Sequence, residues 1–425
     1  MSNEIELIPE LRFPEFEKEG EWEIKELQLL ADRVTDKNKS GKIDKVFTNS
    51  AAHGIVDQRE YFDKDIANKS NLENYYIVEN GDYVYNPRIS TEAPVGPTSR
   101  NNTGRTGVMS PLYTVFRFKE KKNQFYEYYF ISQHWYDSIR KASNTGARFD
   151  RMSITDSVFM SIPVLYPNPQ EQQKIASCLL SLDELIAAHN DKLDALKDHK
   201  KGLLQNLFPQ EGETVPKVRF PEFEDDGEWE IRSVEQNIDL ISGIALKSKE
   251  LSDNNSGTPI LRGINITEGQ IRHSDEMDKF YLGDTSEMEK YLIQENDIVI
   301  GMDGSKVGKN VALISEQDAG AILIQRVARI RAINSDVRYL YQHFFSNVFR
   351  RYVDNVNTSS GIPHISAKQI RDFEIGFPPK IEEQQKIASC LSAVDELITA
   401  QQEKIDELQQ HKKGLMQGLF PKIES

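Results

Sequence analysis

The residues best suited to chemistry lie in polar, glycine-containing loops. The loop 99–107 reads Ser-Arg-Asn-Asn-Thr-Gly-Arg-Thr-Gly. Arg and Asn side chains form bidentate hydrogen bonds with the edges of guanine and adenine in the major groove of DNA, and glycines permit close approach of the backbone. The same composition is typical of an ordinary polar turn, so this loop alone leaves both interpretations open.

Similar residues recur elsewhere in the chain. Arg326, Arg329 and Arg331 alternate along a strand-like segment, and we expect them to share one face. Further candidate loops are 144–148, 303–310 and 357–364. Cations suited to holding phosphates are Arg88, Arg117, Lys119, Lys121 and Lys122. The candidate nucleic-acid contacts are Arg88, Arg100, Asn101, Asn102, Arg105, Arg148, Lys306, Lys309, Arg329, Ser359, Ser360 and His364.

Catalytic motifs are absent from the sequence. The loop 303–310 departs from a Walker A loop, because its first glycine is missing and Asn310 stands where Ser or Thr would bind magnesium. There is no dinucleotide fingerprint and no Asn-Pro-Pro-Tyr of the amino-methyltransferase kind. The 8 histidines are scattered, without the spacing of a zinc site. We therefore expect no catalytic residue, no metal and no cofactor bound by this chain.

The elements that must position these loops are marked by a long internal repeat. The segment 171–209, EQQKIASCLLSLDELIAAHNDKLDALKDHKKGLLQNLFP, returns without a gap as 383–421, EQQKIASCLSAVDELITAQQEKIDELQQHKKGLMQGLFP. Apolar residues recur at heptad a and d positions in both copies, which favours a coiled coil over an ordinary surface helix. Each helix would be roughly 55 Å long at 1.5 Å per residue. The alternative is a pair of helices buried in a large domain.

Both copies interrupt the heptad seam at two matching places. These are His189 with Gln401, near the middle of the helices, and Lys200 with Lys412, near their ends. Antiparallel pairing would bring the first two together, where polar residues could fix the register. The predicted spacer positions are Ile175, Leu179, Leu182, Ile186, His189, Leu193, Leu196, Ile387, Leu391, Val394, Ile398, Gln401, Ile405 and Leu408.

The sequence also predicts where the first long helix begins. Asn168, Pro169 and Glu171 read as an N-cap, a first-turn proline and a capping-box acid, and Pro209 and Pro421 are expected to stop the two helices.

A second repeat precedes each non-repeated region. RFPEFEKEGEWEIK at 12–25 reappears as RFPEFEDDGEWEIR at 219–232. We interpret this aromatic unit as a lid on the neighbouring domain, and a partner-binding surface is compatible with that. The regions between the repeats share turn-and-strand signals at 80–85 and 295–300, so they are predicted to be two diverged copies of one fold.

The predicted fold class is therefore α+β. Two globular α/β domains are joined by two long helices that form an antiparallel coiled coil, with a pseudo-twofold internal repeat. The predicted segments are 1–26, an N-terminal repeat segment packing on a recognition domain; 27–165, the first recognition domain; 166–209, the central helix; 210–233, a linker and second repeat segment; 234–377, the second recognition domain; and 378–425, the C-terminal helix.

Charge is distributed unevenly over these segments. The 425 residues carry a net charge of -15, which argues against a nucleic-acid binder. The segment 27–165 nevertheless holds 19 Lys and Arg against 16 Asp and Glu, and 234–377 holds 16 against 20. Most of the excess acid therefore lies on the repeats. The mean hydropathy of -0.57 and the lack of a long apolar run predict no membrane span.

Cys178 and Cys390 are the only two cysteines, and they are repeat equivalents. Without metal-ligand spacing around them, we expect free thiols in a cytoplasmic protein.

Taken together, the repeats resemble one known family, the specificity (S, HsdS) subunits of type I restriction–modification systems. The resemblance is carried by Glu-Gln-Gln-Lys-Ile-Ala at 171–176 and 383–388, by Pro167 and Pro378 before them, and by His-Lys-Lys-Gly-Leu at 199–203 and 411–415. The Arg-Phe-Pro-Glu-Phe and Gly-Glu-Trp units complete the pattern, and the resemblance covers the whole chain.

The resemblance implies two target recognition domains, each reading one half of a split double-stranded DNA sequence. It implies further that the helices are the spacer and that two modification subunits bind around the repeats. S-adenosylmethionine would belong to those subunits, and ATP and Mg to restriction subunits that can join. The alternatives are a coiled-coil scaffold with two protein-binding domains, and an enzyme such as a fused nuclease or methyltransferase.

Overall fold

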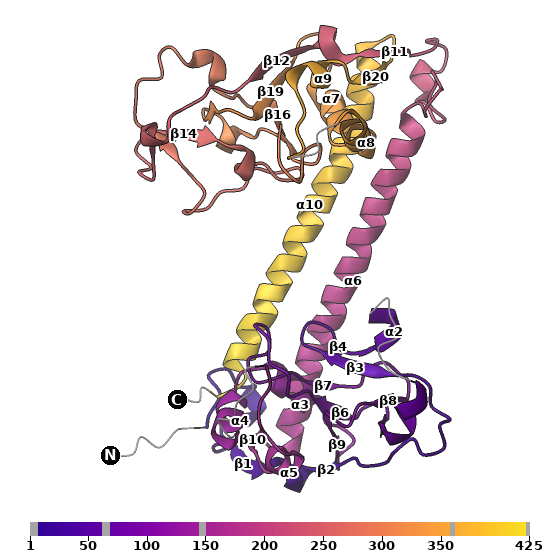
Figure 1. Ribbon diagram of the computed structural model, residues 1–425, viewed down its shortest axis with the longest axis vertical. Helices are drawn as coiled ribbons and strands as arrows, with labels where there is room; N and C mark the ends of the chain where they lie inside the picture. Colours follow the sequence, from indigo (N-terminus) through magenta and orange to yellow (C-terminus); the bar gives the residue numbers. More distant parts are fainter. Residues whose placement is uncertain (1–6, 62–68, 144–149, 358–361, 422–425) are drawn as a thin grey trace. The chain divides into compact units, whose positions relative to one another are not determined.

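The structure, a computed structural model, describes residues 7–61, 69–143, 150–357 and 362–421. The chain divides into two compact units (Figure 1). Unit 1 comprises 1–190 and 403–425, and unit 2 comprises 191–402. Each unit thus combines one of the non-repeated regions with parts of both long helices. The unit boundaries lie inside the two long helices, whereas the segments predicted from the sequence kept each helix whole.

Unit 1 is an α+β domain whose secondary-structure elements are short. Its helices are α1 (Leu27–Leu30), α2 (Gln58–Tyr61), α3 (Gln124–Ile131), α4 (Tyr136–Ala142) and α5 (Asp156–Met160). Its strands are β1 (Glu23–Glu26), β2 (Ala31–Arg33), β3 (Phe47–Ser50), β4 (Gly54–Asp57), β5 (Tyr76–Val78), β6 (Tyr83–Tyr85), β7 (Thr98–Arg100), β8 (Gly107–Met109), β9 (Thr114–Phe118) and β10 (Pro163–Tyr166).

Unit 2 has a corresponding set of elements. Its helices are α7 (Val337–Phe344), α8 (Asn347–Val356) and α9 (Ala367–Arg371). Its strands are β11 (Glu230–Ser233), β12 (Ile238–Ser242), β13 (Leu251–Ser252), β14 (Thr258–Leu261), β15 (Phe280–Tyr281), β16 (Ile298–Gly301), β17 (Val311–Leu313), β18 (Ile322–Leu323), β19 (Val327–Ala332) and β20 (Glu374–Phe377).

The main sheets of the two units have the same topology, whereas the smaller sheets differ: unit 2 has a second four-stranded sheet, β13-β15-β14-β18, and unit 1 has the pairs β3-β4 and β5-β8. The main four-stranded sheet has the order β2-β9-β6-β7 in unit 1 and β12-β19-β16-β17 in unit 2. A two-stranded antiparallel sheet joins β1 to β10, and its counterpart joins β11 to β20. The predicted internal duplication of the fold is therefore confirmed, although the two domain sequences have diverged.

One ion pair recurs at the same place in both main sheets. Asp82 lies in the turn before β6, is buried, and accepts from Nε of Arg117 at 2.6 Å. Asp297 lies in the turn before β16, is also buried, and accepts from Nε of Arg331 at 2.6 Å. The arginines come from β9 and β19, the strands next to these turns. The turn-and-strand signals shared by the two regions thus mark a structural ion pair.

The aromatic repeat packs against the core of its own unit. Trp22 and Trp229 are buried among the core residues of unit 1 and unit 2, respectively. Trp22 packs edge-on against Phe420, which follows α10 (Ile381–Gly418), with ring centroids 6.2 Å apart. Trp229 packs in the same way against Phe208, which follows α6 (Pro169–Leu207), at 6.4 Å.

Arginine anchors each aromatic repeat to the beginning of a long helix. In unit 1, Arg12 donates to both carboxylate oxygens of Glu171 at 2.8 and 2.9 Å. In unit 2, Arg219 donates to Glu383 at 2.7 Å through each of two nitrogens. Glu171 was predicted to be a capping-box acid, and this is wrong because its carboxylate binds Arg12. Asn168 does cap the helix, accepting from the amide of Glu171 at 2.9 Å.

The two long helices run antiparallel within each unit. In unit 1 the first part of α6 shares a core with Leu419 and Phe420, and in unit 2 the end of α6 shares a core with Ile387 and Leu391. Every predicted spacer position is buried or half-buried. The coiled-coil prediction is thereby confirmed. The helices end at Leu207 and Gly418, before the prolines expected to stop them.

The lysine interruptions of the seam are ion pairs between the helices. Lys200 donates to Asp395 at 2.6 Å in unit 2, and Lys412 pairs with Asp183 in unit 1. The two aspartates are repeat equivalents, as are the two lysines. Each aspartate also receives a hydrogen bond at 2.9 Å from its own globular domain, Asp183 from Tyr128 and Asp395 from Gln342.

Cys178 and Cys390 are free and half-buried, as predicted. Over the described ranges, none of the helices combines the length and apolar composition needed to cross a membrane.

Candidate nucleic-acid interface

Three loops of unit 2 meet beside the end of β16. They are 302–310, 324–327 and 362–365, called here the unit 2 loop cluster. The amide of Met302 donates to the carbonyl of Arg326 at 2.9 Å, and the amide of Ile365 donates to the carbonyl of Met302 at 2.9 Å. An antiparallel bridge joins Asp303 to His364. Segments about 60 residues apart in the sequence are thus brought together by main-chain bonds.

The cluster exposes three cationic side chains, Lys306, Lys309 and Arg326. Lys306, Lys309 and His364, all predicted from the sequence, are exposed. Arg326 is exposed too, and its Nη1 donates to Oδ2 of Asp303 at 2.7 Å. Lys306 and Lys309 lie in the tight loop after β16, where Gly304 and Gly308 have positive φ angles of 96° and 78°.

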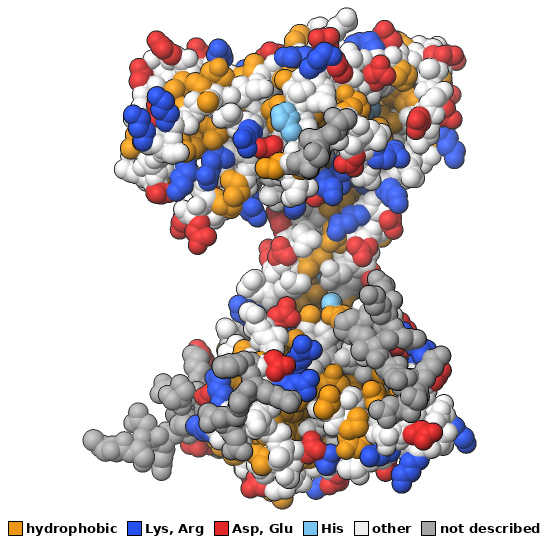
Figure 2. Space-filling model, viewed as in Figure 1, with side chains coloured by type: hydrophobic (Ala, Val, Ile, Leu, Met, Phe, Trp, Pro, Cys, Tyr) orange, Lys and Arg blue, Asp and Glu red, His pale blue; other side chains and the backbone are white. Residues whose placement is uncertain are grey.

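Helix α8 borders the cluster and adds further cations. A Cβ atom on Gly308 would lie 2.9 Å from Cβ of Val353, so the loop and the helix are in direct contact. Arg350 on α8 pairs with Glu268 at 3.0 Å, and Arg351 is exposed. Figure 2 shows Lys and Arg side chains on this face of unit 2, with Asp and Glu side chains interspersed among them. Within the unit 2 loop cluster itself, Lys306, Lys309 and Arg326 outnumber the single acid Asp303, which suits an anionic ligand.

Unit 1 has an equivalent loop cluster formed by 86–97, 110–113 and 150–153. The amide of Met152 donates to the carbonyl of Pro87 at 2.8 Å, as Ile365 does to Met302 in unit 2. A bridge joins Arg88 to Arg151, as one joins Asp303 to His364. Arg88 is exposed and Arg151 half-exposed, but the exposed Glu92 and Asp150 balance their charges, and Asp150 pairs with Arg151 at 3.8 Å. The unit 1 loop cluster is therefore neutral overall, unlike that of unit 2.

The predicted loop 99–107 lies at the other end of β6 from Arg88. Arg100 pairs with Tyr83 at the start of β6, whereas Arg88 follows its end. The structure therefore does not bring Arg88 together with Arg100, Asn102 and Arg105. Arg100 donates to Asn102, Asn102 donates to Glu127 at 2.5 Å, and Arg105 donates to Glu60 at 3.2 Å. These side chains are thus engaged with one another and with their own unit.

The predictions that Asn101 and Arg329 contact bases are wrong. Asn101 is fully buried, and its amide donates to the carbonyls of Glu79 and Arg105, so it shapes the loop from within. Arg329 lies on β19, is only 2% exposed and pairs with Asp239 at 2.5 Å. Neither side chain reaches the surface.

The expectation that Arg326, Arg329 and Arg331 share one face is wrong for Arg326. Arg329 and Arg331 are two residues apart on β19 and do lie on one face of the strand, where Arg331 binds Asp297. Arg326 precedes the strand, in a turn with φ of 70°. The other candidates, Arg148, Ser359 and Ser360, lie outside the described residues.

The phosphate-binding candidates have mixed surroundings. Arg117 is bound to Asp82 and Glu79, and the hydrogen bond to Asp82 raises the pKa of the guanidinium. Lys119 donates to the carbonyl of Leu29 at 3.1 Å, and Lys121 and Lys122 are exposed on the loop before α3.

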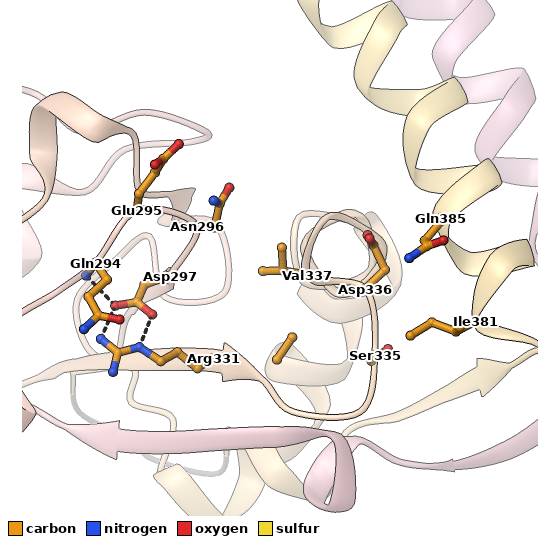
Figure 3. Close-up of a pocket in the computed structure, with 11 residues that line it drawn as sticks. Gln294, Glu295, Asn296, Asp297, Arg331, Ser335, Asp336, Val337, Ile381 and Gln385 are labelled. Atoms are coloured by element: carbon orange, nitrogen blue, oxygen red, sulfur yellow. Dashed lines mark hydrogen bonds and ion pairs between the residues drawn. The ribbon is translucent and has the colours of Figure 1, made fainter.

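Unit 2 has a cleft of about 310 Å³. It is lined by the turn before β16, the start of α7 and the start of α10 (Figure 3). Its charged residues are Glu295, Asp336 and the ion pair of Asp297 with Arg331. Among the described residues, no cluster of three or more His, Cys, Asp or Glu is arranged to hold a metal ion.

Comparison with known proteins places the chain in a family. It matches the type I restriction modification DNA specificity domain twice, over residues 21–198 and 226–410. The chain belongs to this family. The two matches fall on the two copies of the fold.

Relatives in the family span most of the chain. A type I restriction enzyme specificity subunit, MjaVIII, from Methanocaldococcus jannaschii is 25% identical over 75% of this chain and 74% of its own length. The putative MjaX specificity subunit of the same organism is 21% identical over 94% and 93%. The solved type I restriction–modification S subunit of M. genitalium shares the fold, with a TM-score of 0.59, 13% identity, and coverage of 98% of this chain and 100% of that one.

Sequence reasoning passed over two residues of the loop clusters, Arg151 and Leu112. It included Asp303 in the candidate loop 303–310 but did not single it out. One signal was available in the sequence. Aligning the two regions on Asp82 and Asp297 places Arg88 opposite Asp303 and points to the loops after β6 and β16. That the turns before β9 and β19 belong to the same loop clusters becomes evident only from the pairing of the strands.

Proposed function

We propose that the chain is the DNA sequence-recognition subunit of a type I restriction–modification enzyme. Each unit reads one half of a bipartite double-stranded target, and the two long helices keep the halves at a fixed spacing. The observation that carries this proposal is the double match to the DNA specificity domain, with one match on each copy of the fold. The cationic loop cluster of unit 2 supports it.

The chain itself is proposed to be non-catalytic. It would scaffold two modification subunits, which use S-adenosylmethionine to methylate adenine, and restriction subunits, which use ATP and Mg. The complex would act on DNA in the cytoplasm. The partners would supply much of the phosphate neutralisation, because the chain as a whole is acidic, with a net charge of -15. Recognition by near-neutral domains then depends more on base contacts than on non-specific attraction.

Genome-wide mapping of methyladenine tests the proposal, in cells that carry this chain and its modification subunit. The expected result is methylation at a split motif with a constant non-specific gap. A contiguous motif would contradict the two-unit arrangement. Binding of the purified complex to that duplex over competitor DNA excludes a pure scaffold, and cleavage or methylation by the chain alone would establish an enzyme instead.

A further inference from the structure

We propose that Arg326 is a specificity-determining residue of unit 2, which reads the guanine of a G·C pair in the major groove and is positioned for this by Asp303. The inference rests on the proposed DNA-recognition function and assigns one of its contacts. It is carried by the backbone of Arg326, by its ion pair and by the corresponding position in unit 1.

The backbone of Arg326 is held in an unfavourable conformation. Of the described residues other than glycine, only Asn296 and Arg326 have positive φ angles, 66° and 70°. Asn tolerates this region, whereas a long side chain costs about 1–3 kcal/mol there. The turn is kept in place by three main-chain bonds: Met302 to the carbonyl of Arg326, Gln325 to that of Ile244, and Val327 to that of Ile324. Glycine would fit this turn without strain, so a function of the arginine side chain explains its presence.

The side chain is directed outward yet restrained. It is 66% exposed, and a single nitrogen, Nη1, donates to Asp303. A guanidinium has five N–H donors in a fixed fork, so Nε and Nη2 retain donors that match O6 and N7 of guanine. The ion pair reduces the freedom that Arg326 would lose on binding.

The carboxylate of Asp303 argues against a phosphate contact for Arg326. An acidic group beside a phosphate is repulsive, whereas a carboxylate oxygen can accept from N4 of the cytosine paired with that guanine. Lys306 and Lys309, in the same loop as Asp303, have no ion pair with a described carboxylate and are suited to the phosphates. The cluster thus separates base reading from backbone contact.

The equivalent position in unit 1 has different chemistry on the same framework. Ala328 of β19 pairs with Ile300, as Thr114 of β9 pairs with Tyr85. Two residues before these partners lie Arg326 and Leu112, which are 66% and 63% exposed. The position of Asp303 is taken by Arg88 in unit 1, so the charge pair is missing as a whole. The two units thus have the same strand pairing at this position but a different exposed side chain. Such a position is expected to determine specificity.

The test maps methyladenine in cells that carry the modification subunit and either the wild-type chain, Arg326→Gln or Arg326→Lys. The half-site of unit 2 is identified first, as the half that persists when 27–165 is exchanged for another recognition domain. Arg326→Gln is expected to relax one guanine of that half-site by about 5- to 150-fold, corresponding to the roughly 1–3 kcal/mol of a bidentate base contact. Arg326→Lys is expected to relax it too, because lysine lacks the fork. The other half remains unchanged.

Lys309→Gln is the matched control. It is expected to weaken binding to all sequences alike and to reduce the slope of log K against log salt by about one, whereas Arg326→Gln leaves that slope unchanged. Asp303→Asn is expected to relax the same base pair as Arg326→Gln, to a smaller extent.

Two results would overturn the inference. One is an unchanged motif in both Arg326 variants. The other is a uniform loss of affinity when binding is measured to a set of duplexes that carry each base at each position of the half-site. This binding assay also tests the inference if a variant loses all methylation in cells. Failure of the proposed function is distinguishable from both, because the wild-type chain would then give no split motif.

Discussion

At the residue scale, the sequence repeats make the same polar contacts in both units. The pairs Arg12–Glu171 and Arg219–Glu383 bind the aromatic repeat to the start of a long helix in each unit. All four side chains are nearly buried. A buried ion pair contributes little relative to apolar residues of the same shape, but removing one partner leaves an uncompensated charge.

Arg219→Ala is therefore expected to lower the free energy of unfolding of unit 2 by about 3–5 kcal/mol, because the carboxylate of Glu383 stays buried without its partner. Urea unfolding followed by fluorescence measures the change. The matched control is Glu222→Gln, which breaks the exposed pair with Lys386 and should have a much smaller effect. Equal effects of the two substitutions would contradict this assignment.

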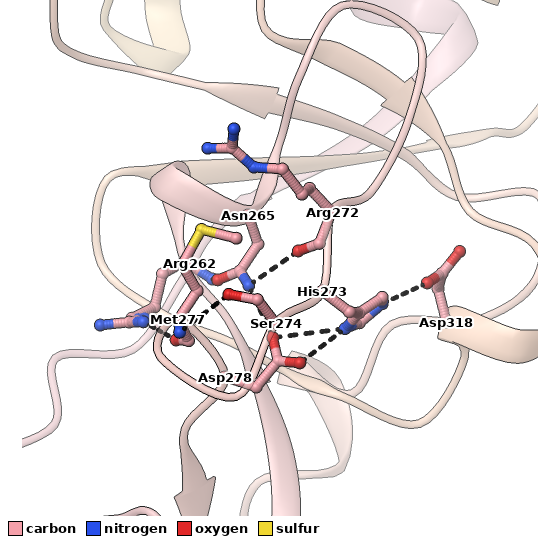
Figure 4. Close-up of polar contacts among 8 residues, drawn as sticks. All are labelled: Arg262, Asn265, Arg272, His273, Ser274, Met277, Asp278 and Asp318. Atoms are coloured by element: carbon pink, nitrogen blue, oxygen red, sulfur yellow. Dashed lines mark hydrogen bonds and ion pairs between the residues drawn. The ribbon is translucent and has the colours of Figure 1, made fainter. Parts of the chain in front are cut away.

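A pH-sensitive contact holds one loop of unit 2. His273 lies between Asp318, at 2.9 Å from Nε2, and Asp278, at 3.2 Å from Nδ1 (Figure 4). The hydrogen bond with Asp318, aided by the charge of Asp278, raises the pKa of His273. Asp278 also accepts from Asn265 at 3.0 Å, which ties the loop together.

Because the folded state raises this pKa above its value in the unfolded chain, the protonated histidine stabilises the fold. The stabilisation is complete below the unfolded pKa of about 6.5 and is lost as pH rises through the folded pKa. Hydrogen exchange in 262–281, corrected for its intrinsic pH dependence, should therefore show more protection at about pH 6 than at pH 8. His273→Gln should remove this difference, and persistence of the difference in that variant would exclude His273 as its origin.

At the scale of elements, the long helices carry a device that fixes their pairing. Lys200 and Lys412 interrupt the apolar seam, and each is matched by an aspartate of the opposite helix, Asp395 or Asp183. A polar residue at a core position of a coiled coil selects one register at some cost in stability. Since Gln342 and Tyr128 also bind these aspartates, the same contact docks each globular domain on the helices.

A double-mutant cycle on Lys200 and Asp395 is expected to give a coupling energy of about 1–2 kcal/mol, because the pair is largely buried and in contact. The four proteins are compared by urea unfolding. The exposed pair of Lys404 with Glu407, on one helix, provides the control and should give no more than about 0.5 kcal/mol. A coupling near zero for Lys200 and Asp395 would remove their proposed role in register.

At the scale of the whole molecule, the continuous helices α6 and α10 each contribute to both units. The proposed function makes their length the variable that sets the gap in the target. Deleting one heptad from each, residues 188–194 and 400–406, shortens a helix by roughly 10 Å.

At 3.4 Å per base pair, this deletion is expected to shorten the gap of the methylated motif by about three base pairs, with both half-site sequences retained. Methyladenine mapping reads out the gap directly. Exchanging 27–165 is the complementary variant, expected to change one half-site and leave the gap intact. An unchanged gap after the heptad deletion would contradict the proposal that the helices set the spacing.

The sequence by itself determined the repeats, the long helices and the duplicated fold class. These are local or periodic properties: a heptad pattern specifies a buried seam whatever it packs against, and two matching seams in one chain predict that they pair. The resemblance to specificity subunits rested on the same repeats. The exposure of Lys306, Lys309 and Arg88 could also be predicted from the sequence, because glycine- and proline-containing loops next to strands lie on the surface.

Only the tertiary structure decided which polar side chains are available for binding. Asn101 and Arg329 belong to residue types that read bases, yet strand pairing turns both inward, and Glu171 binds Arg12 from 159 residues away. The cluster of Asp303, Arg326 and His364 is likewise assembled from three separate loops by main-chain hydrogen bonds. Burial and ion pairing depend on non-local contacts, which residue type and spacing along the chain do not encode.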